Sequence, residues 1–415
     1  MACGAYARYH ESRLNAPVDR RRTSRRGFLK LAAAALLAGG CRRTRSGGAL
    51  LALVNGRLID GTGADPLSGA AVLIEGTRIA FVGPRQRVSI PAEAQVLDVQ
   101  EATILPGLIN AHVHAAYSES TLKAWAGGGV TTVRDLGSGG RRDELFAFRD
   151  EMRDVPACAR LVAAGPMVTV PGGYPMVPWG GSGLTVTSVD DARRQVGTLL
   201  DDGADVVKIA LESGAIFQRE IPMLSPAEAA AIVALAHERG TVVSAHVTAA
   251  RDVEVALDAG VDDLAHMVVD DLPDALIERA VAAGIYWVPT LELWDGVSRV
   301  QGIDLDRRAI RNLERYVAAG GKVALGTDYA GYATPFQVGM PIREIELMLE
   351  AGMSPFQTLV AAMSNAAQVC NLGSEVGTLE VGKRADILVV EGDPLQDVQA
   401  LTRVAWVLRD GALIS

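Results

Sequence analysis

Four of the six histidines in this chain come at the ends of apolar runs, where they could bind a metal ion. The six are His10, His112, His114, His237, His246 and His266. His112 and His114 lie in Asn-Ala-His-Val-His, and residues two apart on a strand point to the same side. A single buried histidine is an ordinary core residue about as often as it is a metal ligand. Four of six at such positions favour zinc or a related ion, because imidazole is a good ligand for these metals.

Two other polar residues end similar apolar runs. Lys208 lies in Val-Val-Lys-Ile-Ala and Asp328 in Leu-Gly-Thr-Asp. Burial would lower the pKa of a lysine and make its neutral amine available for chemistry. The alternatives stay open at this point: Lys208 could extend its amine to solvent at a strand end, and Asp328 or Thr327 could cap a helix.

The elements that would position these residues are expected between residues 108 and 372. Short apolar runs alternate there with helical stretches rich in Ala, Glu and Arg, as in repeated βα units. Eight strands are predicted to begin near Leu108, Val130, Arg160, Ala204, Thr241, Asp262, Tyr286 and Lys322. A helix is predicted from Pro226 to Arg239, with Ser225 as its N-cap and Gly240 after its end. This is the pattern and size of a (β/α)8 TIM barrel, whose site lies at the carboxyl ends of the strands. The alternative, a doubly wound open sheet, lacks its glycine-rich fingerprint here.

The sequences on both sides of this region have the pattern of short strands. Residues 49–107 and 373–415 contain apolar runs separated by Gly and Asp turns, with hairpins expected at Asn55-Gly56 and Glu75-Gly76. We therefore predict an α/β protein in which both ends of the mature chain form one small β-sandwich domain beside the barrel.

Charge is distributed unevenly. The net charge is −9, but residues 1–50 hold eleven Lys or Arg against two acidic residues. The remainder holds 29 basic against 47 acidic residues, so a nucleic-acid partner is not expected.

Residues 1–41 are predicted to be an export signal. Ser-Arg-Arg-Gly-Phe-Leu-Lys at residues 24–30, followed by a short Ala-rich apolar run, resembles a twin-arginine signal. The expected location is the periplasm or cell envelope, reached through the twin-arginine translocase. The run ends in Leu-Ala-Gly-Gly-Cys41, which is similar to a lipoprotein cleavage box, although Ala38 departs from the usual large aliphatic residue. A lipid anchor at Cys41 therefore stays open, as does pairing of Cys158 with Cys370.

A longer series of motifs resembles the amidohydrolase superfamily. It comprises Leu-Pro-Gly-Leu-Ile-Asn-Ala-His-Val-His at 105–114, Val-Lys208, Ala-His246, Ala-His266, Gly-Thr-Asp328 and Gly-Thr-Leu-Glu-Val-Gly-Lys-Arg-Ala-Asp at 377–386. Within it, Thr-Thr-Val-Arg-Asp-Leu-Gly at 131–137 resembles the subgroup of imidazolonepropionase-like proteins and Xaa-Pro dipeptidases.

The resemblance implies two divalent ions, expected to be zinc. His112, His114 and Asp328 would bind one ion and His246 and His266 the other, with Lys208 bridging both as a carbamate formed with carbon dioxide. A bridging hydroxide would attack the substrate, and Asp328 would act as the general base and then protonate the leaving amine.

The expected reaction is hydrolysis of a C–N amide bond in a small molecule, a dipeptide or an N-acyl amino acid. Alternatives are a cyclic amide, as in imidazolonepropionase, or an ester, lactone or phosphotriester; a non-catalytic periplasmic binding protein is a third class. Candidate substrate-binding residues are Tyr117, Arg134, Tyr174 and Arg219, together with Trp294. Arg134 precedes Asp135, so a structural ion pair is an alternative role for it. A homo-oligomer is also compatible with the sequence.

Overall fold

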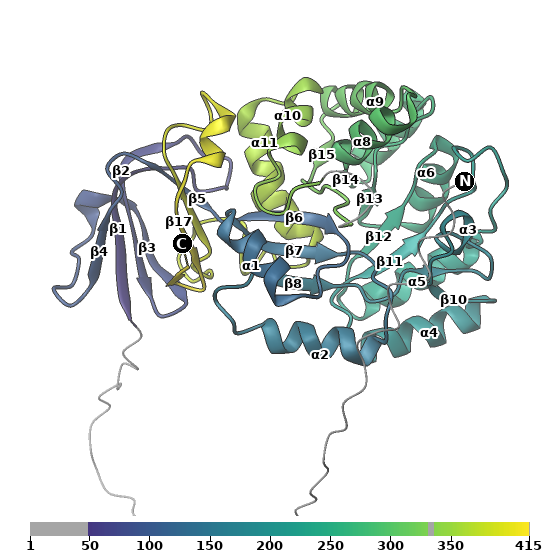
Figure 1. Cartoon of the computed structure of the whole chain (residues 1–415), viewed down its shortest axis with the longest axis horizontal. Coiled ribbons are helices and arrows are strands. Elements are labelled where there is room, and N and C mark those ends of the chain that lie inside the picture. The colour runs from purple at the N-terminus through teal and green to yellow at the C-terminus, as the bar shows by residue number, and fades with distance from the viewer. Residues whose placement is uncertain (1–48, 331–335, 415) are drawn as a thin grey trace, which may run out of the picture. The chain divides into compact units, whose positions relative to one another are not determined.

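A computed structural model describes residues 49–330 and 336–414 of this chain. The predicted export signal and Cys41 lie outside the described residues. The described part contains one mixed sheet and two parallel sheets with their covering helices (Figure 1). Within the described part, no helix is long and apolar enough to cross a membrane.

The mixed sheet contains strands from both ends of the described chain. Its strands are β1 (Leu50–Leu58), β2 (Leu67–Glu75), β3 (Arg78–Pro84), β4 (Gln95–Asp98), β5 (Thr103–Pro106), β16 (Ile387–Val390), β17 (Val404–Arg409) and β18 (Ala412–Leu413). They follow the order β18-β17-β16-β5-β1-β2-β3, and β4 pairs with β1. Alternating strand residues such as Leu53, Val72, Ile104 and Ile387 form the apolar cluster on one face of this sheet.

The two expected hairpins have different outcomes. A hairpin joins β2 to β3 at Glu75-Gly76, as predicted: Glu75 ends β2 and Gly76 and Thr77 form the turn. Asn55-Gly56 is no hairpin but an irregularity within β1, where Asn55 has a φ of 64°. The register shifts there, and β1 pairs with β4 before this point and with β5 after it. A left-handed residue can form a bulge as readily as a turn, so the dipeptide alone did not distinguish them.

All eight predicted strands of the middle region are present and run parallel to their neighbours. They are β6 (Leu108–Val113), β7 (Val130–Asp135), β8 (Arg160–Ala163), β11 (Val207–Ala210), β12 (Val243–His246), β13 (Asp263–Ala265), β14 (Tyr286–Val288) and β15 (Lys322–Val323). Two further strands, β9 (Val168–Thr169) and β10 (Leu184–Thr185), were not predicted. The seven-stranded sheet has the order β10-β9-β11-β12-β13-β14-β15, and β6-β7-β8 form the other. Asp205 N–H donates to the Ala163 carbonyl at 3.0 Å and Ala111 N–H to Leu325 at 2.8 Å, so hydrogen bonds link the two sheets on both sides.

Helices follow the strands along the chain. They are α1 (Glu119–Gly127), α2 (Arg142–Met152), α3 (Met176–Trp179), α4 (Val189–Asp201), α5 (Pro226–Glu238), α6 (Ala250–Ala259), α7 (Asp274–Ala282), α8 (Leu291–Gln301), α9 (Asp306–Ala318), α10 (Ile342–Glu350), α11 (Pro355–Val360) and α12 (Ala366–Val369). The start of α5 is as predicted: Ser225 and Glu228 form a reciprocal capping box, and Pro226 occupies the first turn. Gly240 follows the helix with a φ of 71°.

Cys158 and Cys370 are both buried and both free, so the open question of their pairing is answered for this structure.

Candidate metal centre

The end of β6 and the segment after β15 bring His112, His114 and Asp328 together. Oδ1 of Asp328 lies 3.1 Å from Nε2 of His112 and 3.0 Å from Nε2 of His114, and the two Nε2 atoms are 3.3 Å apart. Two ligand atoms about 2.1 Å from one metal ion stand about 3.0–3.4 Å apart at angles of roughly 90–109°. The three atoms therefore have the mutual spacing of ligands that share an ion.

Backbone contacts hold this arrangement. Asp328 N–H donates to the His112 carbonyl at 2.9 Å. A Cβ at Gly326 would lie 2.8 Å from the Cβ of His112, so only glycine permits this close approach of the two segments. His114 Nδ1 donates to the Gly137 carbonyl at 2.5 Å. Since a carbonyl only accepts, this bond leaves the lone pair of His114 on Nε2, where a metal would bind.

His266 extends the cluster from the end of β13. His112, His266 and Asp328 each offer a ligand atom within 4.8 Å of the others. The rings of His112 and His266 have centroids 4.9 Å apart. Nδ1 of His266 is hydrogen-bonded to Oγ1 of Thr290 at 2.9 Å, which fixes the orientation of the ring. Burial is the main cause that keeps the pKa values of His112 and His266 well below the usual range, and neighbouring positive groups add to it. The neutral form, which binds metals, is therefore favoured.

His246 ends β12 and lies beside His266, with ring centroids 4.7 Å apart. Its other face stacks on Tyr174 at a centroid distance of 4.0 Å. Its Nε2 points to Glu212, whose Oε2 is 3.4 Å away.

Lys208 lies on β11 and is completely buried. Its Nζ has no hydrogen-bond partner among the described residues. Burial, reinforced by the charge of Arg134, lowers the pKa of this amine to about 7, while Asp263 and Asp328 oppose the shift. The neutral form of the amine is therefore accessible near neutral pH. Because Lys208 is completely buried, its amine does not extend to solvent, so that alternative is wrong.

Among the five candidate substrate-binding residues, Arg134 lies in the interior. It is fully buried, and its guanidinium forms two hydrogen bonds to Asp263, at 2.8 and 3.0 Å. It also donates to the carbonyls of Ala111 and Val369, both at 2.6 Å. These bonds occupy the guanidinium and correct its assignment as a substrate ligand. The structural alternative holds, with Asp263 as the partner rather than Asp135.

The other candidates lie in different surroundings. Tyr174 stacks directly on His246, so it is at the cluster. Tyr117 packs against Phe148 of α2, with ring centroids 6.1 Å apart. Arg219 is exposed on the loop after β11. Trp294 is buried on α8, with its ring 6.3 Å from that of His266.

Sequence reasoning missed Glu212 and Thr290, and it named Asp135 only as a possible ion-pair partner of Arg134. Asp135 is buried and accepts hydrogen bonds from Ala116 N–H, Gly137 N–H and the Ser138 hydroxyl, which shapes the turn that carries the Gly137 carbonyl. Glu212 lies four residues after Lys208, and residues an even number apart on an extended strand point to the same side. This spacing could have indicated that Glu212 lies near the site. Nothing local indicates that Thr290 is close to His266, 24 positions away.

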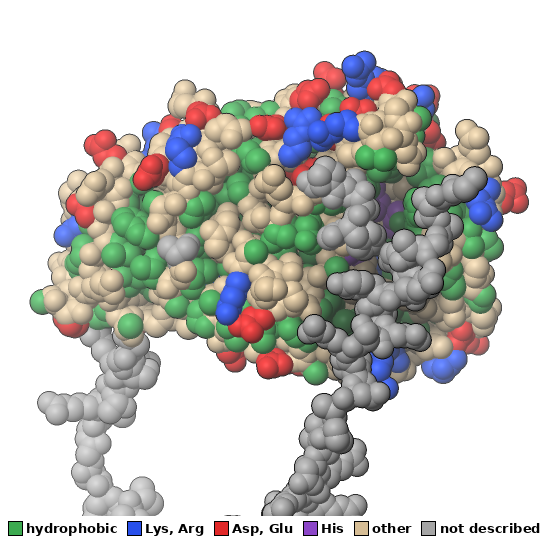
Figure 2. Space-filling view, in the orientation of Figure 1, with side chains coloured by type: hydrophobic (Ala, Val, Ile, Leu, Met, Phe, Trp, Pro, Cys, Tyr) green, Lys and Arg blue, Asp and Glu red, His purple; other side chains and the backbone are tan. Residues whose placement is uncertain are grey.

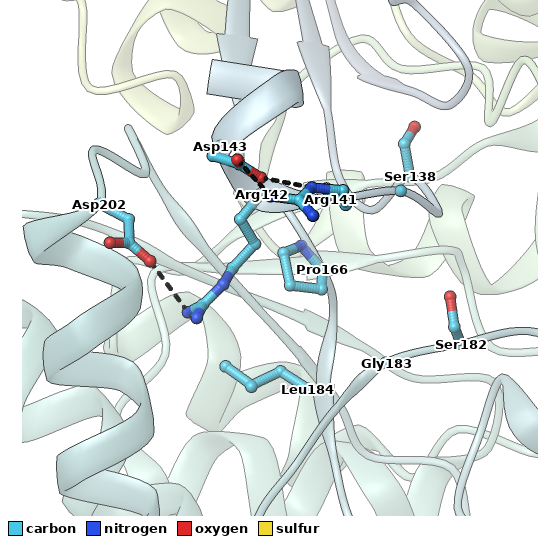
Figure 3. A pocket seen from close by; sticks show the side chains of 10 residues that line it. Ser138, Arg141, Arg142, Asp143, Pro166, Ser182, Gly183, Leu184 and Asp202 are labelled. Atoms are coloured by element: carbon cyan, nitrogen blue, oxygen red, sulfur yellow. Dashed lines mark hydrogen bonds and ion pairs between the residues drawn. The ribbon is translucent and has the colours of Figure 1, made fainter. Parts of the chain in front are cut away.

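A pocket adjoins this turn without including any of the histidines (Figure 3). Ser138 lines it, together with Arg142, which reaches Asp202 at 3.2 Å, and Arg141, which is paired with Asp143. Histidine side chains are visible in a recess of the face that Figure 2 shows. The histidine cluster is thus distinct from this pocket.

Comparisons with known proteins match one family model and relatives with several different activities. A family model described as "Amidohydrolase family" matches residues 103–414. An ochratoxinase from Aspergillus niger is 26% identical over 407 residues, covering 83% of this chain and 82% of the relative. An imidazolonepropionase from Symbiobacterium thermophilum is 24% identical, covering 78% and 84%. The solved structure of a prolidase complexed with N-methylphosphonate-L-proline is 26% identical, with a TM-score of 0.74, and the match covers 88% of this chain and 99% of that one.

Proposed function

Because this chain belongs to the amidohydrolase family and is therefore an enzyme, we propose that it is a metal-dependent hydrolase that cleaves a C–N amide bond of a dipeptide or N-acyl amino acid. The observation that carries this proposal is the position of the Asp328 carboxylate, 3.0–3.1 Å from Nε2 of both His112 and His114. The buried, unpartnered amine of Lys208 is the second support. The names of the relatives, which include a prolidase, favour an amide substrate.

The donor set fits two divalent cations, expected to be zinc. His112, His114 and Asp328 would hold one, and His246 and His266 the other. Lys208 would contribute to both sites as a carbamate. Its neutral amine would form an N–C bond to carbon dioxide and release a proton, which gives two oxygens that share one negative charge. Bound divalent cations supply a Lewis acid and lower the pKa of a coordinated water.

Asp328 would carry the protons of the reaction. Its Oδ1 is directed at the two histidines, which leaves Oδ2 to accept a proton from the attacking water. The same carboxyl group then protonates the leaving nitrogen as the C–N bond breaks, so the proton is returned within one turnover. We propose that Tyr174, which stacks on His246, contacts the substrate. We also propose that Arg219, which is exposed on the loop after β11, binds a substrate carboxylate.

The experiment is to measure bound divalent metal in the full-length protein and in Lys208→Ala, with the exposed Lys123→Ala as a matched control. We expect about two ions per chain in the wild type and in the control, and fewer in Lys208→Ala, with hydrolysis of dipeptides or acyl amino acids by the wild type. A single ion that Lys208→Ala leaves in place would contradict the proposal and favour the cyclic amidase alternative, for which the imidazolonepropionase relative is the precedent.

For the architecture, we propose a closed (β/α)8 barrel over residues 108–372, with a small β domain from residues 49–107 and 373–415. The described strands of this domain form one mixed sheet, so the expected pair of packed sheets of a β-sandwich is not what the strand pairing gives. Hydrogen bonds on both sides of the two parallel sheets support the closure. We further propose that residues 1–41 direct twin-arginine export to the periplasm or cell envelope. Arg25→Lys together with Arg26→Lys should retain the protein inside the cell, as followed by fractionation.

A further inference from the structure

Thr290 holds the ring of His266 with a hydroxyl that would ordinarily cap a helix. Thr290 is the residue directly before α8, and threonine at this position commonly accepts a hydrogen bond from the helix backbone. Here the hydroxyl makes no such bond. Its Oγ1 lies 2.9 Å from Nδ1 of His266 instead. The first N–H groups of α8 therefore need another acceptor.

Glu344 supplies this acceptor from a different helix. It lies on α10 and is completely buried. Its Oε1 accepts a hydrogen bond from Leu291 N–H at 3.0 Å, and its Oε2 accepts one from Glu292 N–H at 2.7 Å. These are the first two residues of α8, directly after Thr290. One carboxyl group thus caps the helix in place of the Thr290 hydroxyl.

The backbone of Thr290 also depends on its neighbours. Its φ of 49° is in the left-handed region, which a β-branched residue rarely adopts. Such a conformation persists only where surrounding contacts hold it. The two bonds to Glu344 fix the chain on the α8 side of Thr290, and the bond to His266 fixes its hydroxyl.

We propose that Glu344 is a positioning residue for the second divalent cation. Because Glu344 caps α8, the Thr290 hydroxyl is available to accept from Nδ1 of His266, and this bond leaves the lone pair of His266 on Nε2, where a metal would bind. Glu344 would thus act through Thr290 rather than as a ligand. The inference rests on the proposed function, which assigns His266 to the second ion, and adds the contacts that orient this ligand.

The test is zinc titration of the full-length protein and of Glu344→Gln, which keeps the size of the side chain but leaves one acceptor oxygen for two N–H donors. We expect the second ion to bind at least about 10-fold more weakly, while the first ion is retained. Glu346→Gln is the matched control, because Glu346 lies on the same helix but is partly exposed and contacts Arg343 and Gln399. It should bind both ions with wild-type affinity.

Variants of Thr290 show whether its hydroxyl transmits the effect. We expect Thr290→Val, which loses the hydroxyl, to weaken the second ion as Glu344→Gln does, and Thr290→Ser, which keeps it, to stay within a few-fold of wild type. The double variant Glu344→Gln with Thr290→Val should bind the second ion about as weakly as Thr290→Val alone, because both changes remove one shared contact. A merely structural role of Glu344 would give additive losses.

Wild-type affinity for the second ion in Glu344→Gln, with thermal melting showing that it is folded, overturns the inference, as do additive losses in the double variant. If Glu344→Gln does not fold, Glu344→Asp replaces it, because the shorter side chain cannot reach both N–H groups, and the same outcomes decide. A wild type that binds no second ion contradicts the proposed function instead, so the two failures are distinguishable.

Discussion

Several residues at the cluster have backbone angles that side chains rarely adopt. His266 has a φ of 72°, Asp328 of 61° and Thr290 of 49°. A non-glycine residue in this left-handed region costs of order 1–3 kcal/mol and persists only where surrounding contacts hold it. His266 directly follows β13, Thr290 lies two residues after β14 and Asp328 five residues after β15. Each side chain contacts another residue of the cluster. The strain is thus associated with the residues that form the site.

Asp328→Asn tests the proton-transfer role at the scale of one residue. The amide keeps an oxygen for the cluster but cannot accept a proton from water, so we expect turnover to fall about 10²- to 10⁴-fold with the bound metal largely retained. Steady-state rates and metal content on the same sample measure this. Turnover within a few-fold of wild type would mean that another group is the base.

At the scale of elements, the Arg134–Asp263 pair joins β7 to β13, and Arg134 also reaches the carbonyl of Val369 on α12. Four of the five N–H donors of the planar Arg134 guanidinium have acceptors on these elements, so one side chain holds several elements together. Arg134, which the sequence suggested as a substrate ligand, therefore stabilises the fold instead.

Arg134→Met is expected to destabilise the protein by roughly 3–5 kcal/mol, because it leaves Asp263 buried without its partner. Urea unfolding measures this difference. Arg141→Met is the matched control, since Arg141 pairs with Asp143 on the surface and such pairs contribute about 0–1 kcal/mol. Similar losses in the two variants would refute the structural role assigned to Arg134.

Element types were predictable because the hydrophobic pattern that defines them is local. The eight parallel strands and α5 begin close to the predicted residues, and Ser225 caps α5 as its sequence indicates. Asn55-Gly56 was wrong as a hairpin because its outcome depends on β4 and β5, the strands that become neighbours of β1. The positions of the candidate ligands at or near strand ends were predictable for the same local reason, whereas partners such as Thr290 were not.

At the scale of the whole molecule, the candidate ligands come from β6, β11, β12 and β13 and from the segment after β15. The two proposed ions would together crosslink segments spread over about half of the chain. Metal binding should therefore stabilise the fold as a whole, since the unfolded chain does not hold these ligands together.

Removal of metal by a chelator is accordingly expected to lower Tm. With free ion at about 100 times Kd, one site contributes roughly 2.7 kcal/mol of stability. Differential scanning calorimetry with and without the chelator measures the loss, and readdition of zinc should restore Tm. An unchanged Tm in a sample shown to be metal-free would contradict a shared metal centre.

The sequence by itself determined which His, Lys and Asp residues lie at or near strand ends, and it determined the family resemblance. His112 and His114 could be assigned to one side of a strand because side chains alternate with a period of two. The tertiary structure alone decided that Arg134 pairs with Asp263, that Glu212 faces His246 and that Gly137 fixes the tautomer of His114. These contacts join residues from 23 to 129 positions apart, and they depend on which strands become neighbours and how each turn directs its side chains. A local pattern specifies neither.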